Sequence, residues 1–190
     1  MTTEYGQKIA GALKAIAMLH SDTSKLLSDC DKQIGKGRNS IFGNYATRDL
    51  TYNVKAACWM AEGVYRYYEA GPRLVDGVTV TFFNKEADTE PLLKVARIQY
   101  ANPELGNGPG AEEEGLKAVC GEWDIWRLLF EWAVDRELGK VLMFTDTDQG
   151  RIAWARLIAV PLFSISRIED VTDLMGRVLA SAPQVHEVAP

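Results

Sequence analysis

The sequence has few of the residues on which disulfide, metal and imidazole chemistry depend. Its 190 residues include three cysteines and two histidines. The cysteines Cys30, Cys58 and Cys120 are odd in number and far apart, which fits neither a disulfide framework nor the paired spacing of a zinc site. We expect small, buried, apolar thiols, because a nucleophilic cysteine would need a base and only His20 and His186 could supply an imidazole.

Long apolar runs are also missing from the sequence. A clean stretch such as Leu157 to Phe163 is far shorter than the roughly 20 residues that a membrane-spanning helix requires. The first residues, Met1 to Glu4, lack the basic start and the apolar core of a secretory signal. We therefore expect no membrane association and a cytoplasmic location.

A general excess of positive charge is the third feature that the chain lacks. Its 21 Lys and Arg residues and 26 Asp and Glu residues give a formal net charge of −5, which argues against general attraction to nucleic acid. The charge is unevenly distributed along the sequence. Residues 25–55 hold six basic and three acidic residues, a net charge of +3, whereas residues 101–150 hold four basic and eleven acidic residues, a net charge of −7.

The composition that remains is typical of a globular protein. Hydrophobic residues make up 47% of the chain and charged residues 25%. This length is sufficient for one sizeable core, but two full domains would be cramped. We predict a helical hairpin extension over residues 1–71, an α+β sheet domain over 72–182 and a flexible tail over 183–190.

The first part of the chain predicts two antiparallel helices. Apolar or small residues recur at alternating steps of four and three from Ile9 to Ile34, which predicts one helix of about 30 residues. Residues from Leu50 to Tyr68 again repeat at helical spacing, and Gly71-Pro72 ends that segment. Joined by the glycine-rich stretch 35–45, the two helices predict an αα-hairpin.

The rest of the chain predicts a sheet with further helices. Four runs rich in β-branched, aliphatic and aromatic residues predict two β-hairpins: residues 78–83 with 92–100, and residues 141–144 with 152–163. Helical spacing predicts helices over 122–134 and from Ser166 onward, the second beginning with a capping box, Ser166 to Glu169. The order ββαββα after the αα-hairpin predicts an α+β fold with helices packed on one face of an antiparallel sheet.

Two carboxylates, Asp146 and Asp148, follow the apolar run 141–144 and could hold a divalent cation. Phosphoryl-transfer enzymes with an aspartyl nucleophile use a superficially similar arrangement, but at the first strand of a doubly wound parallel sheet. Here only about 40 residues follow, and they predict a strand and a helix. We interpret Asp146 to Gly150 as a hairpin turn and predict no metal and no cofactor.

The glycine-rich segment between the predicted helices holds the best candidate binding residues. It lacks the GxxxxGK[ST] spacing of a phosphate-binding loop. Its concentrated positive charge lies near an aromatic ring, a combination that suits a phosphate or an acidic surface. The predicted binding residues are Lys36, Arg38, Tyr45 and Arg48. His20 lies in the apolar stripe of the first helix, where we expect it to pack.

These patterns contain no convincing catalytic set. They favour a non-enzymatic binding or adaptor protein that engages a protein partner through the helical hairpin and the sheet face, and that forms a homodimer. Two alternatives stay open. One is a small-molecule or nucleotide sensor, or an enzyme, with a pocket between the sheet and the helices near Asp146 and Asp148. The other is nucleic-acid binding through the basic tip of the hairpin.

Overall fold

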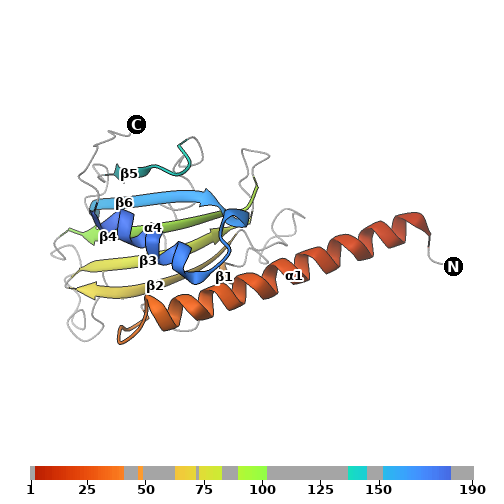
Figure 1. The fold of residues 1–190 in the computed structure, drawn as a ribbon, viewed down its shortest axis with the longest axis horizontal. Coiled ribbons are helices and arrows are strands. Elements are labelled where there is room, and N and C mark those ends of the chain that lie inside the picture. Colours follow the sequence, from red (N-terminus) through yellow and green to blue (C-terminus); the bar gives the residue numbers. More distant parts are fainter. Residues whose placement is uncertain are drawn as a thin grey trace, which may run out of the picture.

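The computed structural model describes residues 3–40, 47–48, 63–71, 73–82, 90–101, 137–144 and 152–180. In these parts, the chain combines helices with an antiparallel sheet, which confirms the predicted α+β class (Figure 1). The elements are α1 (Glu4–Gln33), β1 (Thr47–Arg48), β2 (Gly63–Gly71), β3 (Leu74–Thr81), β4 (Leu92–Tyr100), β5 (Val141–Phe144), β6 (Ile152–Pro161), the short 3₁₀ helix η5 (Leu162–Ser164) and α4 (Ile168–Ala180).

Within the described residues, the sheet has six strands in the order β1-β2-β3-β4-β6-β5, and every neighbouring pair is antiparallel. Strand β3 pairs with β4 along its whole length, and β5 pairs with Ala155 to Ile158 of β6, so both predicted strand pairings are present. The sheet runs across residue 71. The predicted boundary at that residue stays a prediction about which parts of the chain fold independently.

Helix α1 has the length that the apolar stripe predicts, 30 residues. Its first turn is capped by Thr3, whose hydroxyl accepts a hydrogen bond from the Gly6 amide at 3.2 Å. At the other end, the amides of Ile34 and Gly35 both donate to the Cys30 carbonyl. Gly35 passes so close to the Tyr68 ring that an added Cβ would overlap it. The chain therefore leaves the helix where only glycine fits against the sheet.

The predicted second helix, Leu50 to Tyr68, is wrong over its last part, because Gly63–Gly71 form strand β2. Val64 and Tyr68 are separated by an even number of positions, four. Alternate residues share one face of a strand, so this spacing fits a strand as well as a helix. Residues 50–62, the predicted helix over 122–134 and the tail 183–190 lie outside the described residues.

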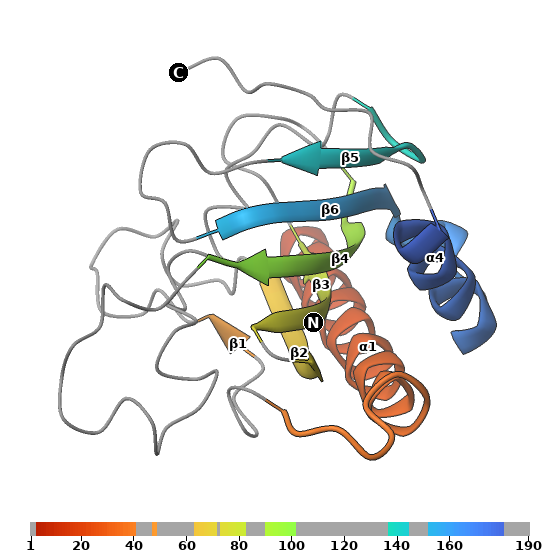
Figure 2. The ribbon, with the colours of Figure 1, turned by 90° about the vertical axis from the view of Figure 1, so that its left-hand side faces the viewer.

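Two apolar clusters lie on opposite faces of the sheet. One face is covered by α1 and α4, which pack side by side on it (Figure 2). Its centre includes Cys30 from α1, Val78 and Val95 from the strands, and Val171 from α4, all at 0% exposure. The opposite face carries the second cluster, which includes Tyr67.

Helix α4 begins at Ile168, two residues after the predicted start. The predicted capping glutamate, Glu169, is not the residue that holds this end. Asp170 accepts hydrogen bonds from the amides of Ser166 and Arg167 at 2.9 and 3.1 Å. These amides hold the pKa of the Asp170 carboxyl below its usual value. No helix within the described ranges has a stretch long and apolar enough to cross a bilayer.

Two glycine substitutions test this packing: one should lower the free energy of unfolding and the other should raise it. Gly77 pairs with Tyr67 across the sheet, and a Cβ at Gly77 would overlap the buried Tyr67 ring. We predict that Gly77→Ala lowers the free energy of unfolding by about 1–3 kcal/mol. Gly176 in α4 has open space around its Cα, so Gly176→Ala should raise that energy by about 0.5–1 kcal/mol. Urea unfolding measures both, and a stable Gly77→Ala variant would contradict the described register.

Candidate protein-docking surface

The N-terminal half of α1 extends beyond the sheet and carries an exposed apolar stripe (Figure 1). We call this the α1 stripe: Tyr5, Ile9, Leu13 and Ile16. Their side chains are 74%, 45%, 62% and 37% exposed. They are spaced by four, four and three residues, so they lie along one side of the helix. Four large apolar side chains on one solvated helix face are unusual for a helix that has no partner.

The same spacing continues into the second half of the helix, where it is buried. Thr23, Leu27, Cys30 and Ile34 follow in phase and are all less than 9% exposed. Leu27, Cys30 and Ile34 pack in the cluster between α1, the sheet and α4. One heptad-like apolar pattern thus runs along α1: the sheet and α4 cover its C-terminal half, and its N-terminal half is exposed.

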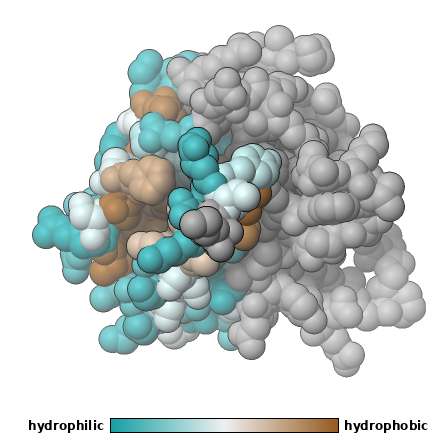
Figure 3. Space-filling model, turned by 90° about the vertical axis from the view of Figure 1, so that its right-hand side faces the viewer, coloured by the Kyte–Doolittle hydropathy of each residue, from teal (hydrophilic) through white to brown (hydrophobic). Residues whose placement is uncertain are grey.

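A groove lies alongside the covered half of the helix. It runs between Ala15 to Asp29 of α1 and the segment Leu162 to Ile168, and its volume is about 750 Å³. Leu19 and Leu26 line it from α1, and Phe163, which is 71% exposed, lines it from the opposite wall. Figure 3, seen from the N-terminal end of α1, shows brown and tan side chains gathered beside the projecting helix. The groove and the α1 stripe are neighbours on one helix.

Charged and small residues border this surface in a definite pattern. Alanines such as Ala12 and Ala15 lie between the large apolar residues and leave room for a close helix approach. Lys8, Asp22 and Asp29 are separated by multiples of seven residues and therefore lie along one line of the helix surface. The surface thus has an apolar centre with charges at its edge.

The C-terminal end of α1 is fixed to the sheet by Asp31. The Tyr68 hydroxyl donates to this carboxylate at 2.8 Å, and the Arg66 Nε donates to it at 3.3 Å. Burial, followed by the hydrogen bond to Asp31, raises the pKa of Tyr68 above its usual value. Burial, followed by the charges of Asp31 and Asp29, raises the pKa of the Cys30 thiol to about 12. Cys30 is therefore a buried, packed thiol, as the sequence predicts.

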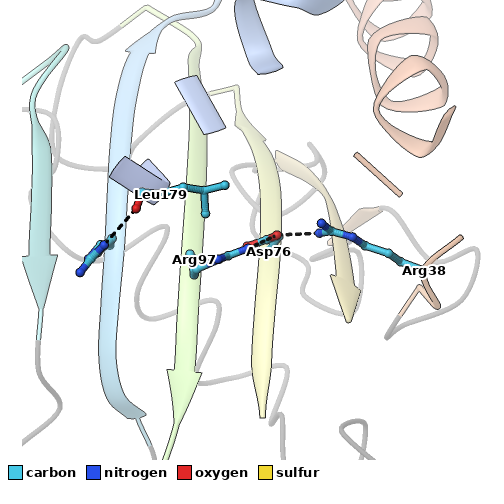
Figure 4. Close-up of polar contacts among 5 residues, drawn as sticks. Arg38, Asp76, Arg97 and Leu179 are labelled. Atoms are coloured by element: carbon cyan, nitrogen blue, oxygen red, sulfur yellow. Dashed lines mark hydrogen bonds and ion pairs between the residues drawn. The ribbon is translucent and has the colours of Figure 1, made fainter. Parts of the chain in front are cut away.

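The next charged group along the sheet is Asp76, which is 1% exposed (Figure 4). Arg97 donates to both of its oxygens, from Nε at 2.6 Å and from Nη2 at 2.8 Å. Arg38, from the turn after α1, donates from Nη1 at 2.6 Å. Arg156 lies opposite Arg97 on β6 and donates to the Leu179 carbonyl near the end of α4 at 3.4 Å. This row of polar side chains connects the sheet to both helix ends.

The predicted binding residues are only partly described. Lys36 is exposed in the turn after α1. Arg38 donates to the buried Asp76, a carboxylate that it shares with Arg97. Tyr45 lies outside the described residues, and only the backbone of Arg48 is described, in β1. A shared site of these four residues therefore stays a prediction.

The other residues singled out in the sequence are His20, Asp146 and Asp148. His20 stacks on the Phe82 ring with 4.9 Å between ring centres but is exposed, so the predicted packing role is met only in part. Asp146 and Asp148 lie outside the described residues. Within the described residues, no group of three or more His, Cys, Asp or Glu side chains could hold a metal ion.

Sequence reasoning missed two charged residues, Asp76 and Lys94, that lie buried in the described part of the sheet. Asp76 stands in the apolar run Leu74 to Thr81, and Lys94, which is 1% exposed, stands on the opposite face in the run Leu92 to Tyr100. Thr79, directly opposite Lys94, lies 2.9 Å from the Tyr67 hydroxyl. The signal in the sequence was a charged residue within a run of apolar strand residues, because a charged side chain that is buried there needs a polar partner.

Removing the Asp76 carboxylate tests its role in fixing the turn after α1. Asp76→Ala leaves Arg97 and Arg38 without their acceptor, so we predict a loss of about 3–5 kcal/mol in the free energy of unfolding. Glu69→Ala is the matched control, because its hydrogen bond to Asn39 is exposed and should contribute less than about 1 kcal/mol. Equal losses in the two variants, measured by urea unfolding, would refute the role given to Asp76.

Alkaline unfolding tests the burial of Cys30. A pKa raised from 9.0 to about 12 means that the folded thiol keeps its proton where the unfolded thiol loses it. This contribution to stability is complete below pH 9 and is lost as the pH rises toward 12. Between pH 9 and 10, wild type should lose about 1 kcal/mol more than Cys30→Ala, measured by urea unfolding. Parallel pH profiles would show that the thiol is accessible.

The chain was also compared with known proteins. No family model, no curated protein and no solved structure matches it. The surfaces described above are therefore the basis for a proposal about function.

Proposed function

We propose that this protein is a non-enzymatic binding protein that docks a helical segment of a protein partner on helix α1. The observation that carries this proposal is the α1 stripe, an exposed continuation of a buried apolar pattern. Amphipathic helices commonly bind by placing residues at such spacing into an apolar groove, and α1 offers both a ridge and a groove. The sequence predicted a helical hairpin as the binding element, and this proposal assigns binding to its first helix, α1, alone.

The described residues give less support to the alternative functions. Nucleic-acid binding relied on the basic segment after α1, but Arg38 of that segment is paired with Asp76. A small apolar ligand has more support, because the groove volume of about 750 Å³ lies in the range of ligand sites. The exposure of Tyr5 and Ile9 favours a partner protein, since both residues lie outside the lining of the groove. The buried Cys30 thiol fits a reducing compartment, and we propose the cytoplasm.

Site-specific photocrosslinking in cells tests this function. A benzoylphenylalanine in place of Tyr5 keeps an aromatic ring at a position that is 74% exposed. The same residue in place of Lys14 is the control, because Lys14 is exposed on the other side of the helix. We predict adducts with the mass of a protein at position 5 and none at position 14.

Ile9→Glu should abolish the adduct at position 5, because it places a charge in the centre of the α1 stripe. Equal adducts at both positions, or none at either, would contradict protein docking. Copurification of a single apolar small molecule, detected by native mass spectrometry and lost in Phe163→Glu, would instead assign the groove to a small ligand.

A further inference from the structure

We infer that the helical segment bound on α1 is the projecting half of α1 from a second copy, in an antiparallel dimer with two-fold symmetry. The inference rests on the proposed function and names its partner. Each copy would place its α1 stripe in the groove of the other copy. The same contact then forms twice, because a two-fold interface pairs one surface patch with itself.

The positions of ridge and groove along one helix favour this occupant. The α1 stripe spans Tyr5 to Ile16, about 17 Å at 1.5 Å per residue, and the α1 wall of the groove spans Ala15 to Asp29, about 21 Å. The two stretches are similar in length and meet near residue 16. Turning one helix end over end about a point between residues 18 and 19 therefore places Ile9, Leu13 and Ile16 opposite residues 28, 24 and 21 of the other copy, within the α1 wall of its groove.

The edge charges select the antiparallel direction. In this arrangement, residue 8 of one copy lies beside residue 29 of the other, so Lys8 and Asp29, which in one copy are ion-paired with Glu4 and Lys32, meet twice across the interface. A parallel, in-register pair would instead place Lys8 against Lys8 and Asp29 against Asp29. Opposite charges at the flanks of a helix pair determine orientation, and like charges oppose it.

The shape of the molecule is compatible with this pairing. The first half of α1 extends away from the sheet, and the N-terminus lies far from α4 (Figure 1). An antiparallel pair therefore puts the two described sheets at opposite ends of the paired helices. Phe163, exposed on the far wall of the groove, would cover the outer side of the partner helix.

Sedimentation equilibrium of the full chain tests the dimer. Ile9→Glu alters the stripe, and Phe163→Glu alters the groove wall. Both residues are exposed, so the variants should keep the wild-type circular dichroism spectrum. We expect a wild-type dimer at micromolar concentration and a dissociation constant at least tenfold higher in each variant. Leu138→Glu is the matched control, because Leu138 is an exposed apolar residue, 40% exposed, that does not line the groove.

A distance measurement tests the direction. A nitroxide on a non-canonical residue in place of Glu4 avoids the native cysteines, and Glu4 is 83% exposed. In the antiparallel dimer, residue 4 lies opposite residue 33, so the two labels are separated by 29 residues, roughly 44 Å. In-register parallel helices would put them within about 25 Å. Pulsed electron paramagnetic resonance distinguishes the two distances.

The outcomes separate this inference from the proposed function. A monomeric chain that still crosslinks to another protein through position 5 would overturn the dimer and leave the proposed function standing. A monomeric chain with no adduct would overturn both. A dimer that Ile9→Glu and Phe163→Glu leave intact, or one with the short label distance, would overturn the inferred interface.

Discussion

Packing of α1 on the sheet is the interaction on which the rest of the structure depends. A helix of 30 residues is about 45 Å long, whereas strands of 8 to 10 residues extend about 26–33 Å. The sheet therefore covers only part of the helix, and the buried residues of α1 begin at Thr23. Because the apolar pattern does not stop where the sheet stops, the fold leaves the α1 stripe in water.

Polar contacts determine which half of α1 is covered. Asp31 holds the last turn of the helix to Tyr68, and the Asp76 cluster holds the turn that follows through Arg38. Arg156 reaches the end of α4 on the same face of the sheet. These contacts all lie near the C-terminal ends of the helices. Apolar packing alone is not directional. These polar contacts fix the orientation of α1, so its N-terminal half points away from the sheet.

The sequence predicted the elements whose signals are local. Alternating steps of four and three gave the full length of α1, and β-branched runs gave the strands of both hairpins. The predicted helix through Tyr68 failed because an even spacing fits a strand equally well. The exposed stripe was also beyond prediction, because Ile9 and Cys30 follow the same pattern and only the extent of the sheet separates them. The pairing of Arg38 with Asp76 joins residues 38 positions apart, for which a single sequence carries no signal.

The inferred dimer requires that another copy cover the projecting half of α1 in solution. Hydrogen–deuterium exchange of the full chain at several protein concentrations tests it most directly. If the dimer forms, amides of residues 7–20 exchange slowly at high concentration and become fast on dilution, while those of residues 27–33 stay protected throughout. Fast exchange over residues 7–20 at every concentration would show that this half of the helix has no such partner.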